Sequence, residues 1–60
     1  MRQLNQLKKM WEGNGFRVEV KDAPPDAVTF DKMVLVFTES NTIRSLYFYS
    51  SKDDKILGQF

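Results

Sequence analysis

The chain has 60 residues with nine basic and eight acidic side chains, a net charge of +1, and neither cysteine nor histidine. This composition excludes disulfide staples and catalysis by a thiolate or an imidazole, and it removes the commonest ligand of transition metals. A chain of this length forms one small domain, residues 1–60, near the lower limit at which a single core is stable without staples.

The first segment predicts a short amphipathic helix. Leu4, Leu7 and Trp11 recur at spacings of three and four residues, with polar side chains elsewhere on the helical wheel. The letters EGNG at 12–15 end this pattern, because glycine readily takes the left-handed conformation that closes a helix. A helix of about three turns is marginal alone and needs a surface to pack on.

The next residues predict a strand and a loop. Apolar and charged side chains alternate over residues 16–21, which is typical of a half-buried strand. Two prolines then break the pattern and predict an ordered surface loop over residues 22–27. Residues 28–31 leave two alternatives open, the return of this loop with its apolar side chains tucked inward or a first piece of the next strand.

Residues 33–38 and 43–50 predict an antiparallel hairpin, and 56–60 predict a last edge strand. The fold class is therefore α+β, with an N-terminal helix packed on a three- or four-stranded antiparallel meander in two layers. An even-numbered turn centred on Ser40 and Asn41 gives a self-consistent register. In that register Leu35 lies opposite Leu46, Met33 opposite Phe48, and Val34 opposite Tyr47.

Both faces of this hairpin are apolar, so each apolar side chain must be assigned either to the face under the helix or to the exposed face. We assign to the layer under the helix Leu4, Leu7, Trp11, Phe16, Val18, Val20, Met33, Leu35, Phe37, Leu46 and Phe48. The exposed face then carries Val34, Val36, Ile43, Tyr47 and Tyr49, with Arg17 and Lys21 as a charged rim. An exchange of the two faces stays open, because both parities are apolar.

An exposed apolar face of this kind indicates an interaction site, since contiguous apolar patches are uncommon on monomers. Tyrosine and arginine are also the residue types that dominate interface energetics. We expect a small non-enzymatic protein-binding module that forms a homo-oligomer or docks on a larger protein as an inhibitor or adaptor. The alternative is a strand buried on both sides within its own chain.

Motifs for catalysis or metal binding are missing. The serines have no histidine to activate them, and lysines in the polar turn at 51–55 lack the burial that would make one a base. Asp22, Asp26 and Asp31 share one loop without the spacing of a calcium site. The glycines at 13–15 follow a helix, whereas a phosphate loop precedes one. We therefore expect no enzyme activity, no cofactor and no metal.

Nucleic-acid binding is the alternative function. Tyr47 and Tyr49 on a sheet, with Phe48 as a third aromatic residue, could stack on single-stranded bases. Basic side chains fall in the same part of the predicted sheet: Arg17, Lys21, Arg44 and Lys52. The charge balance lacks the basic excess of a protein held mainly by phosphate contacts, so we favour a protein partner.

The sequence also gives expectations about location and origin. The first eleven residues lack the apolar run of a secretory signal, and no apolar run approaches the roughly 20 residues that span a bilayer. We expect a cytoplasmic protein with no membrane segment. Small chains without catalytic residues are common among phage and plasmid accessory proteins, which is our expectation of origin.

The stretch LNQLKKMWEGNGFRVEV, residues 4–20, resembles the opening of small messenger-RNA interferase toxins with a double-stranded-RNA-binding-like fold. The resemblance covers under a third of the chain. The catalytic histidine of that family has no counterpart here, so the resemblance implies neither its activity nor its site.

Overall fold

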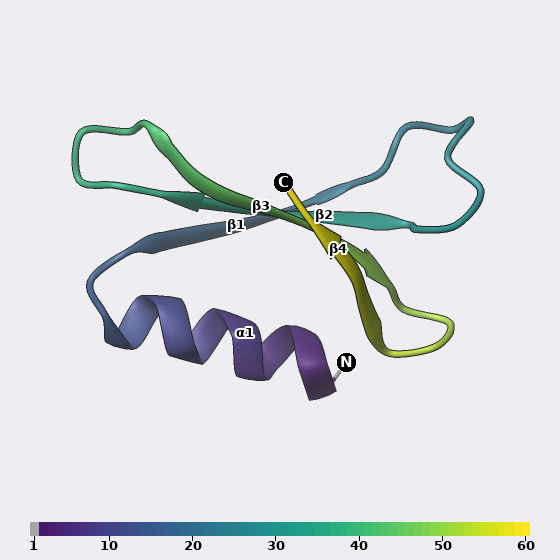
Figure 1. Ribbon diagram of the computed structural model, residues 1–60, viewed down its shortest axis with the longest axis horizontal. Coiled ribbons are helices and arrows are strands. Elements are labelled where there is room, and N and C mark those ends of the chain that lie inside the picture. The colour runs from purple at the N-terminus through teal and green to yellow at the C-terminus, as the bar shows by residue number, and fades with distance from the viewer. Residues whose placement is uncertain (1) are drawn as a thin grey trace.

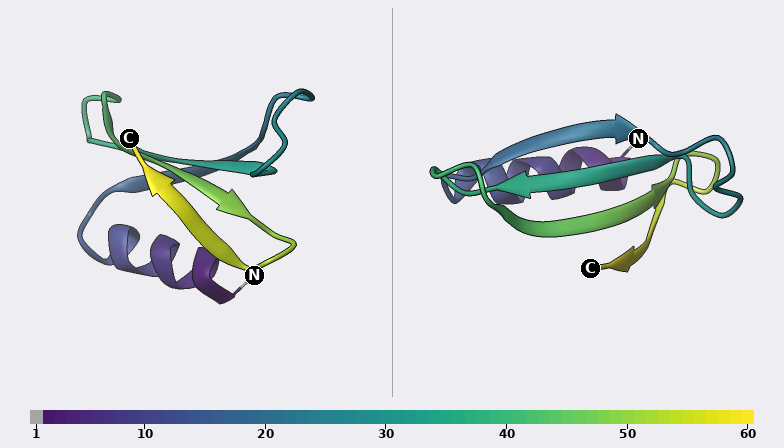
Figure 2. Two further views of the ribbon diagram at one scale, coloured as in Figure 1. Left: turned by 45° about the vertical axis from the view of Figure 1, so that its right-hand side comes forward. Right: turned by 90° about the horizontal axis from the view of Figure 1, so that it is seen from above.

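The computed structural model describes residues 2–60, which form one helix and a four-stranded antiparallel sheet (Figure 1). Helix α1 spans Arg2–Gly13, and the strands are β1 (Arg17–Asp22), β2 (Lys32–Phe37), β3 (Ile43–Ser50) and β4 (Lys55–Gln59). The order in the sheet is β1-β2-β3-β4, so each strand pairs with its neighbour in sequence. Helix α1 packs on one face of the sheet (Figure 2). The predicted two-layer α+β fold is confirmed, and the sheet contains the fourth strand.

The end of α1 has the left-handed glycine that the sequence predicts. Gly15 has a φ of 89°. The Phe16 N–H donates to the Trp11 carbonyl at 3.1 Å, and the Gly15 N–H donates to the Glu12 carbonyl at 3.1 Å, which is the bonding pattern of a Schellman cap. The rings of Trp11 and Phe16 meet edge to face at 5.0 Å. Among residues 2–60, no helix is long and apolar enough to span a bilayer.

Replacing Gly15 by alanine will lower the free energy of unfolding by about 1 kcal/mol, because an L side chain is strained at this positive φ. No atom lies within 4 Å of the added Cβ, so the strain alone sets the cost. The matched control is Gly13→Ala, which will raise the stability by about 0.5 kcal/mol by removing a glycine from a helix. Urea titration measures both. Equal effects of the two substitutions would contradict this account of the cap.

The register of β2 on β3 was predicted correctly, although the turn between them is of another kind. Residues 39–41 form a loop of odd length, closed by the Thr38 N–H donating to the Thr42 carbonyl at 2.9 Å. Asn41 takes the left-handed conformation with a φ of 64°. A bulge at Arg44 then adds one residue to β3 and restores the predicted parity. The predicted pairs are all present: Leu35 with Leu46, Met33 with Phe48, and Val34 with Tyr47.

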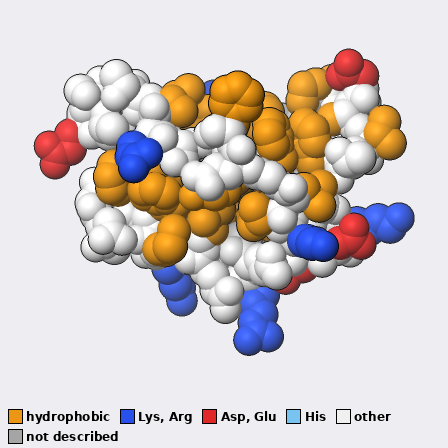
Figure 3. Space-filling model, viewed as in Figure 1, with side chains coloured by type: hydrophobic (Ala, Val, Ile, Leu, Met, Phe, Trp, Pro, Cys, Tyr) orange, Lys and Arg blue, Asp and Glu red, His pale blue; other side chains and the backbone are white. Residues whose placement is uncertain are grey.

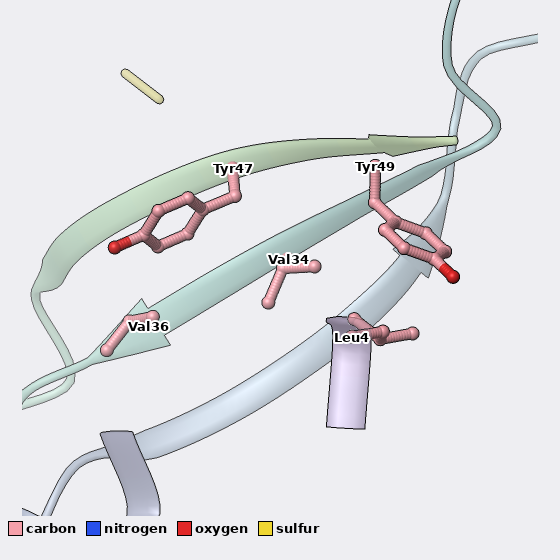
Figure 4. Close-up of a cluster of buried hydrophobic side chains, with 5 residues drawn as sticks. All are labelled: Leu4, Val34, Val36, Tyr47 and Tyr49. Atoms are coloured by element: carbon pink, nitrogen blue, oxygen red, sulfur yellow. The ribbon is translucent and has the colours of Figure 1, made fainter. Parts of the chain in front are cut away.

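The assignment of faces in β2 and β3 was wrong. Side chains predicted for the exposed face are buried under α1, where they form the core with Leu4 (Figure 4): Val34, Val36, Tyr47 and Tyr49. Partly buried side chains pack against this core: Leu7, Trp11, Phe16, Val18 and Ile56. The side chains of these strands that were predicted to lie inside, Met33, Leu35, Phe37, Leu46 and Phe48, have the opposite parity and point away from α1.

The register of β1 on β2 explains this exchange of faces. Val18 lies opposite Val36, and Val20 lies opposite Val34, so the apolar side of β1 continues into these two valines. Helix α1 leads into β1 through a tight turn at residues 14–16 and packs on that same side. The side of β2 under α1 is therefore the one that carries Val34 and Val36.

Both tyrosines on the core side have a polar partner for the hydroxyl group, which is what allows tyrosine to be buried. The Trp11 Nε1–H donates to the Tyr47 hydroxyl oxygen at 3.2 Å. The Tyr49 hydroxyl donates to the Asp54 carboxylate. This bond and the burial of the ring raise the pKa of Tyr49 to about 12.

The start of α1 is fastened to the turn between β3 and β4. The Asp54 carboxylate accepts the Gln3 backbone N–H, with distances of 3.3 and 3.4 Å to its two oxygens. Gln3 Oε1 in turn accepts the Ile56 N–H at 3.2 Å. No acidic residue lies in the first turn of α1, so Asp54 supplies the negative charge that a helix start favours. The bonds from the Tyr49 hydroxyl and the Gln3 amide hold the pKa of Asp54 below its ordinary value.

Residues 28–31 are the return of the loop and form no strand. The Ala23 N–H donates to the Asp31 carbonyl at 2.9 Å, and the Asp31 N–H donates to the Tyr49 carbonyl at 3.1 Å, so both ends of the loop are held at the sheet. Of the two apolar side chains expected to be tucked inward, Phe30 packs on Phe48 with ring centroids 4.8 Å apart, whereas Val28 is exposed.

Candidate functional site

The face of the sheet turned away from α1 is the candidate site, and we call it the open face. Its centre is apolar, and its side chains come from the two middle strands: Met33, Leu35 and Phe37 in β2, and Ile43, Leu46 and Phe48 in β3. None of them is buried. Figure 3 has the view of Figure 1, in which the sheet is seen nearly edge-on, and there hydrophobic side chains gather over the middle of the molecule.

The bulge in β3 decides which side chains reach the open face at its left end in Figure 1. Ile43 pairs with Phe37 and is 60% exposed, so one of the predicted apolar site residues does lie on this face. Arg44 is the extra residue, and its guanidinium lies 5.9 Å from the ring centroid of Trp11 on the helix side. The bulge therefore adds an apolar side chain to the open face and turns a cation away from it.

The margin of the open face along β1 is charged. Arg17, Glu19 and Lys21 lie opposite Phe37, Leu35 and Met33, so the two predicted rim residues, Arg17 and Lys21, are on this face. The Arg17 guanidinium lies 4.4 Å from the ring centroid of Phe37, donates to Asn41 Oδ1 at 2.9 Å and pairs with Glu19. Among residues 2–60, Lys21 has no such ion pair.

The opposite margin, along β4, is apolar. Gly58 lies opposite Phe48, and a Cβ added to this glycine would be 3.9 Å from the Phe48 ring. Leu57 is the extra residue of a second bulge and is 43% exposed. Phe60 is 89% exposed, and its N–H donates to the Leu46 carbonyl at 2.7 Å. The open face thus passes from a charged margin on β1 to an apolar margin on β4.

Two loops rise at the ends of the open face, on the side away from α1 (Figure 1). One is the 38–42 loop between β2 and β3, which carries the exposed Glu39. The other is the 23–31 loop between β1 and β2, in which Val28 is 94% exposed. The view from above shows them at the two ends of the strands (Figure 2). The backbone of each loop thus stands above one end of the open face, and we call these two loops its walls.

The wall formed by the 23–31 loop is well fixed. The Asp31 carboxylate accepts the Ser51 N–H at 2.7 Å and the Ser51 hydroxyl, and these bonds lower the pKa of Asp31. The Ala27 N–H donates to the Pro24 carbonyl at 3.0 Å and closes a turn. A hollow of about 570 Å³ between this loop and the β3–β4 turn is lined by residues 27–31, 50–53 and Leu57.

The loop aspartates do not converge on a common point. Asp22 lies 3.2 Å from the Lys32 ammonium, Asp31 binds Ser51, and Asp26 is exposed. Among residues 2–60, no group of acidic side chains could hold a metal ion.

The structure buries the two tyrosines on which the nucleic-acid alternative mainly depended and leaves Phe48, its third aromatic residue, on the open face. Tyr47 and Tyr49 are buried under α1 and cannot stack on bases. Of the basic residues expected beside them, Arg44 lies over Trp11 and Arg17 over Phe37.

Sequence reasoning placed the apolar side chains of the open face, except Ile43, in the core. The open face belongs to the parity that pairs with the charged side chains of β1. The alternation within β1 was visible in the sequence, but the residues of β2 that lie opposite it were not. Arg17, Glu19 and Lys21 must point to solvent, so whatever lies opposite them shares the exposed side. No local pattern in the sequence indicated that the Asp54 carboxylate would accept the Gln3 N–H at the start of α1.

Comparison of the chain with protein-family models, with curated proteins and with solved structures found no match. The resemblance noted for residues 4–20 therefore has no support from these comparisons.

Proposed function

We propose that this chain is a small non-enzymatic protein-binding module whose open face binds a second copy of the same chain. The observation that supports the proposal most directly is the apolar centre of the open face. Phe30 packs on Phe48 and the Arg17 guanidinium lies over Phe37, yet none of the six central side chains is fully buried. Apart from the exposed Ile43 these side chains are half-buried, so a partner would add for each of them a part of the roughly 1.5–3 kcal/mol that full burial of a large apolar side chain contributes. Summed over six side chains, this is large beside the few kcal/mol that stabilise so small a domain.

The dimensions of the open face match a weak, reversible dimer. The Cα positions of the whole chain span 32 Å on the long axis, which runs roughly along the strands, and 15 Å on the short axis, so the open face has an outline of at most roughly 500 Å² per copy before side chains are added. Stable interfaces bury about 800 Å² per partner, and transient ones bury less. A net charge of +1 leaves little repulsion between copies. We expect a dissociation constant on the order of micromolar.

Pairing through the sheet edges is less favourable than pairing through the open face. The exposed edge strand β1 carries Arg17, Glu19, Lys21 and Asp22, and charged side chains on an edge strand oppose the addition of another strand. The other edge strand, β4, is short and contains a bulge and Gly58, which weaken strand pairing. The open face has neither obstacle.

The double variant Leu35→Ser/Leu46→Ser will raise the dissociation constant of the dimer at least 100-fold, because these side chains face each other at the centre of the open face. The control is Gln6→Ser on the exposed side of α1, which will leave the constant unchanged. Sedimentation equilibrium over a wide concentration range measures the constant, and far-ultraviolet circular dichroism checks that each variant is folded.

Two outcomes would overturn the proposal. A wild-type chain that stays monomeric up to millimolar concentration has no second copy on the open face. A dimer that survives the double variant unchanged pairs through another surface, such as the β1 edge.

A further inference from the structure

The two walls of the open face restrict how a second copy can lie on it. Both loops rise on the side that the partner must approach (Figure 1). If the strands of the two copies were aligned, either parallel or antiparallel, the walls of one copy would meet the walls of the other. The two sheets could then not reach the spacing of about 10 Å at which sheets pack. Sheets also pack with their strands nearly perpendicular. In that arrangement the walls of each copy lie beyond the two outer strands of the partner's sheet, because the sheet is narrower across its strands than along them.

The proportions of the open face favour this crossed arrangement. The whole chain spans 32 Å on its long axis, roughly along the strands, where the walls stand, and 15 Å on its short axis, across them. The two walls of one copy can therefore lie on either side of the other copy's sheet, one beside β1 and one beside β4. Since the two copies are identical, a two-fold axis relates them, and each contact occurs twice.

Two crossed arrangements satisfy this symmetry, and the margins of the open face distinguish them. In one, the 38–42 loop lies beside the partner's charged β1 margin, and the 23–31 loop lies beside the partner's apolar β4 margin. In the other, the loops exchange places, so the apolar Val28 meets the charged margin and Glu39 meets Leu57. Burial of an unpaired charge against an apolar edge is costly, which favours the first arrangement.

We propose that two copies bind through their open faces with strands crossed, so that Glu39 in the wall of each copy pairs with Lys21 on the β1 margin of the other. The inference rests on the proposed function, self-association through the open face. On the β1 margin, Lys21 is the cation that has no ion pair within residues 2–60, since Arg17 is paired with Glu19. Glu39 is exposed and, within the same residues, has no ion pair.

The second contact accounts for an apolar side chain that has no cover in the single chain. Val28 is 94% exposed at the wall formed by the 23–31 loop, and the loop is held by backbone bonds at both ends. In the crossed arrangement it lies against the partner's β4 margin, where Leu57 and Phe60 are also exposed. An apolar contact at one pair of edges thus accompanies a charged contact at the other.

Charge reversal tests the pairing of Glu39 with Lys21. Each of Glu39→Lys and Lys21→Glu will raise the dissociation constant at least tenfold at low salt. The double variant Glu39→Lys/Lys21→Glu will restore it to within about threefold of the wild type, because the symmetric pair is rebuilt with the charges exchanged. The controls are Glu12→Lys and Lys9→Glu, which make the same charge changes on the exposed surface of α1 and will have little effect. The effects of the single variants will shrink in about 1 M salt.

Cross-linking tests the geometry independently of charge, and the absence of native cysteine makes it specific. A mixture of Val28→Cys and Leu57→Cys chains will form the mixed disulfide in excess over either symmetric one. A mixture of Gln6→Cys and Leu57→Cys chains is the control and will not. If Leu35→Ser/Leu46→Ser abolishes the dimer but the double charge reversal fails to rescue and the mixed disulfide is not enriched, the crossed arrangement is wrong and self-association through the open face stands.

Discussion

Val34→Asn will lower the free energy of unfolding by about 4 kcal/mol, whereas Leu35→Asn, one residue along the same strand, will lower it by about 1 kcal/mol or less. Val34 is fully buried between the sheet and α1. The substitution loses roughly 1.5–3 kcal/mol of apolar burial and places an amide without a partner in the core at a cost of about 1–3 kcal/mol. Leu35 lies on the open face, where an amide stays in contact with water.

Urea titration at a protein concentration low enough to keep the chain monomeric measures both variants, because association through the open face would add to the apparent stability. A domain of this size has about 3–5 kcal/mol in total, so we expect Val34→Asn to be largely unfolded by circular dichroism. If Leu35→Asn lowered the free energy of unfolding more than Val34→Asn, the core would lie on the Leu35 side of the sheet and this account would be wrong.

The stability of the chain will fall at both ends of the pH scale because of the bonds around Asp54. In the folded chain the pKa of Asp54 is held below its ordinary value by the Tyr49 hydroxyl and the Gln3 amide. Its contribution is therefore present above the unfolded pKa of about 3.9 and is lost as the pH falls through the lower folded pKa. Protonation also removes the charge that caps α1, so we expect the helix signal to decrease first in acid.

The loss of stability at alkaline pH follows from Tyr49, whose pKa is raised to about 12 by its bond to Asp54 and by burial. Because the folded pKa is the higher one, the contribution is present below the unfolded pKa of about 10 and is lost as the pH rises through about 12. Tyr49→Phe will remove most of this alkaline loss. Asp54→Asn will lower the stability at pH 7 and reduce the acid loss.

Some acid loss will remain in Asp54→Asn, since Ser51 lowers the pKa of Asp31 as well. The matched control is Asp53→Asn, an exposed neighbour in the same turn. Urea midpoints from pH 2 to pH 12 measure these profiles. An Asp53→Asn profile that matches the one for Asp54→Asn would mean that the turn, and not the tether to α1, sets the acid stability.

Local patterns in the sequence were sufficient for the secondary structure and for one ladder of the sheet. Leu35 and Leu46 were paired correctly because alternation on both strands fixes parity, and the odd loop and the bulge compensate each other. The glycine cap after Trp11 was predictable because only a left-handed residue ends a helix in that way. Such features depend on neighbouring residues alone.

The choice of core face was not fixed by those patterns. Both parities of β2 are apolar, and the length of the 23–31 loop leaves its register on β1 undetermined. The charged side chains of β1 were the available guide, since Glu19 lies opposite Leu35 and both face water. The bond from Gln3 to Asp54 joins residues 51 positions apart, and no spacing rule relates them. The site was therefore predicted as an apolar sheet face with Arg17 and Lys21 beside it, but on the wrong side of the two middle strands.

The tether between the start of α1 and the β3–β4 turn also has a consequence for the order of events during synthesis. The segment of α1 leaves the ribosome before the rest of residues 2–60, yet the carboxylate that caps it belongs to Asp54 and is made late. Each strand ladder joins neighbours in sequence and can form as soon as its second strand emerges. We expect the growing chain to assemble its sheet strand by strand, while the helix gains its cap only in the final step.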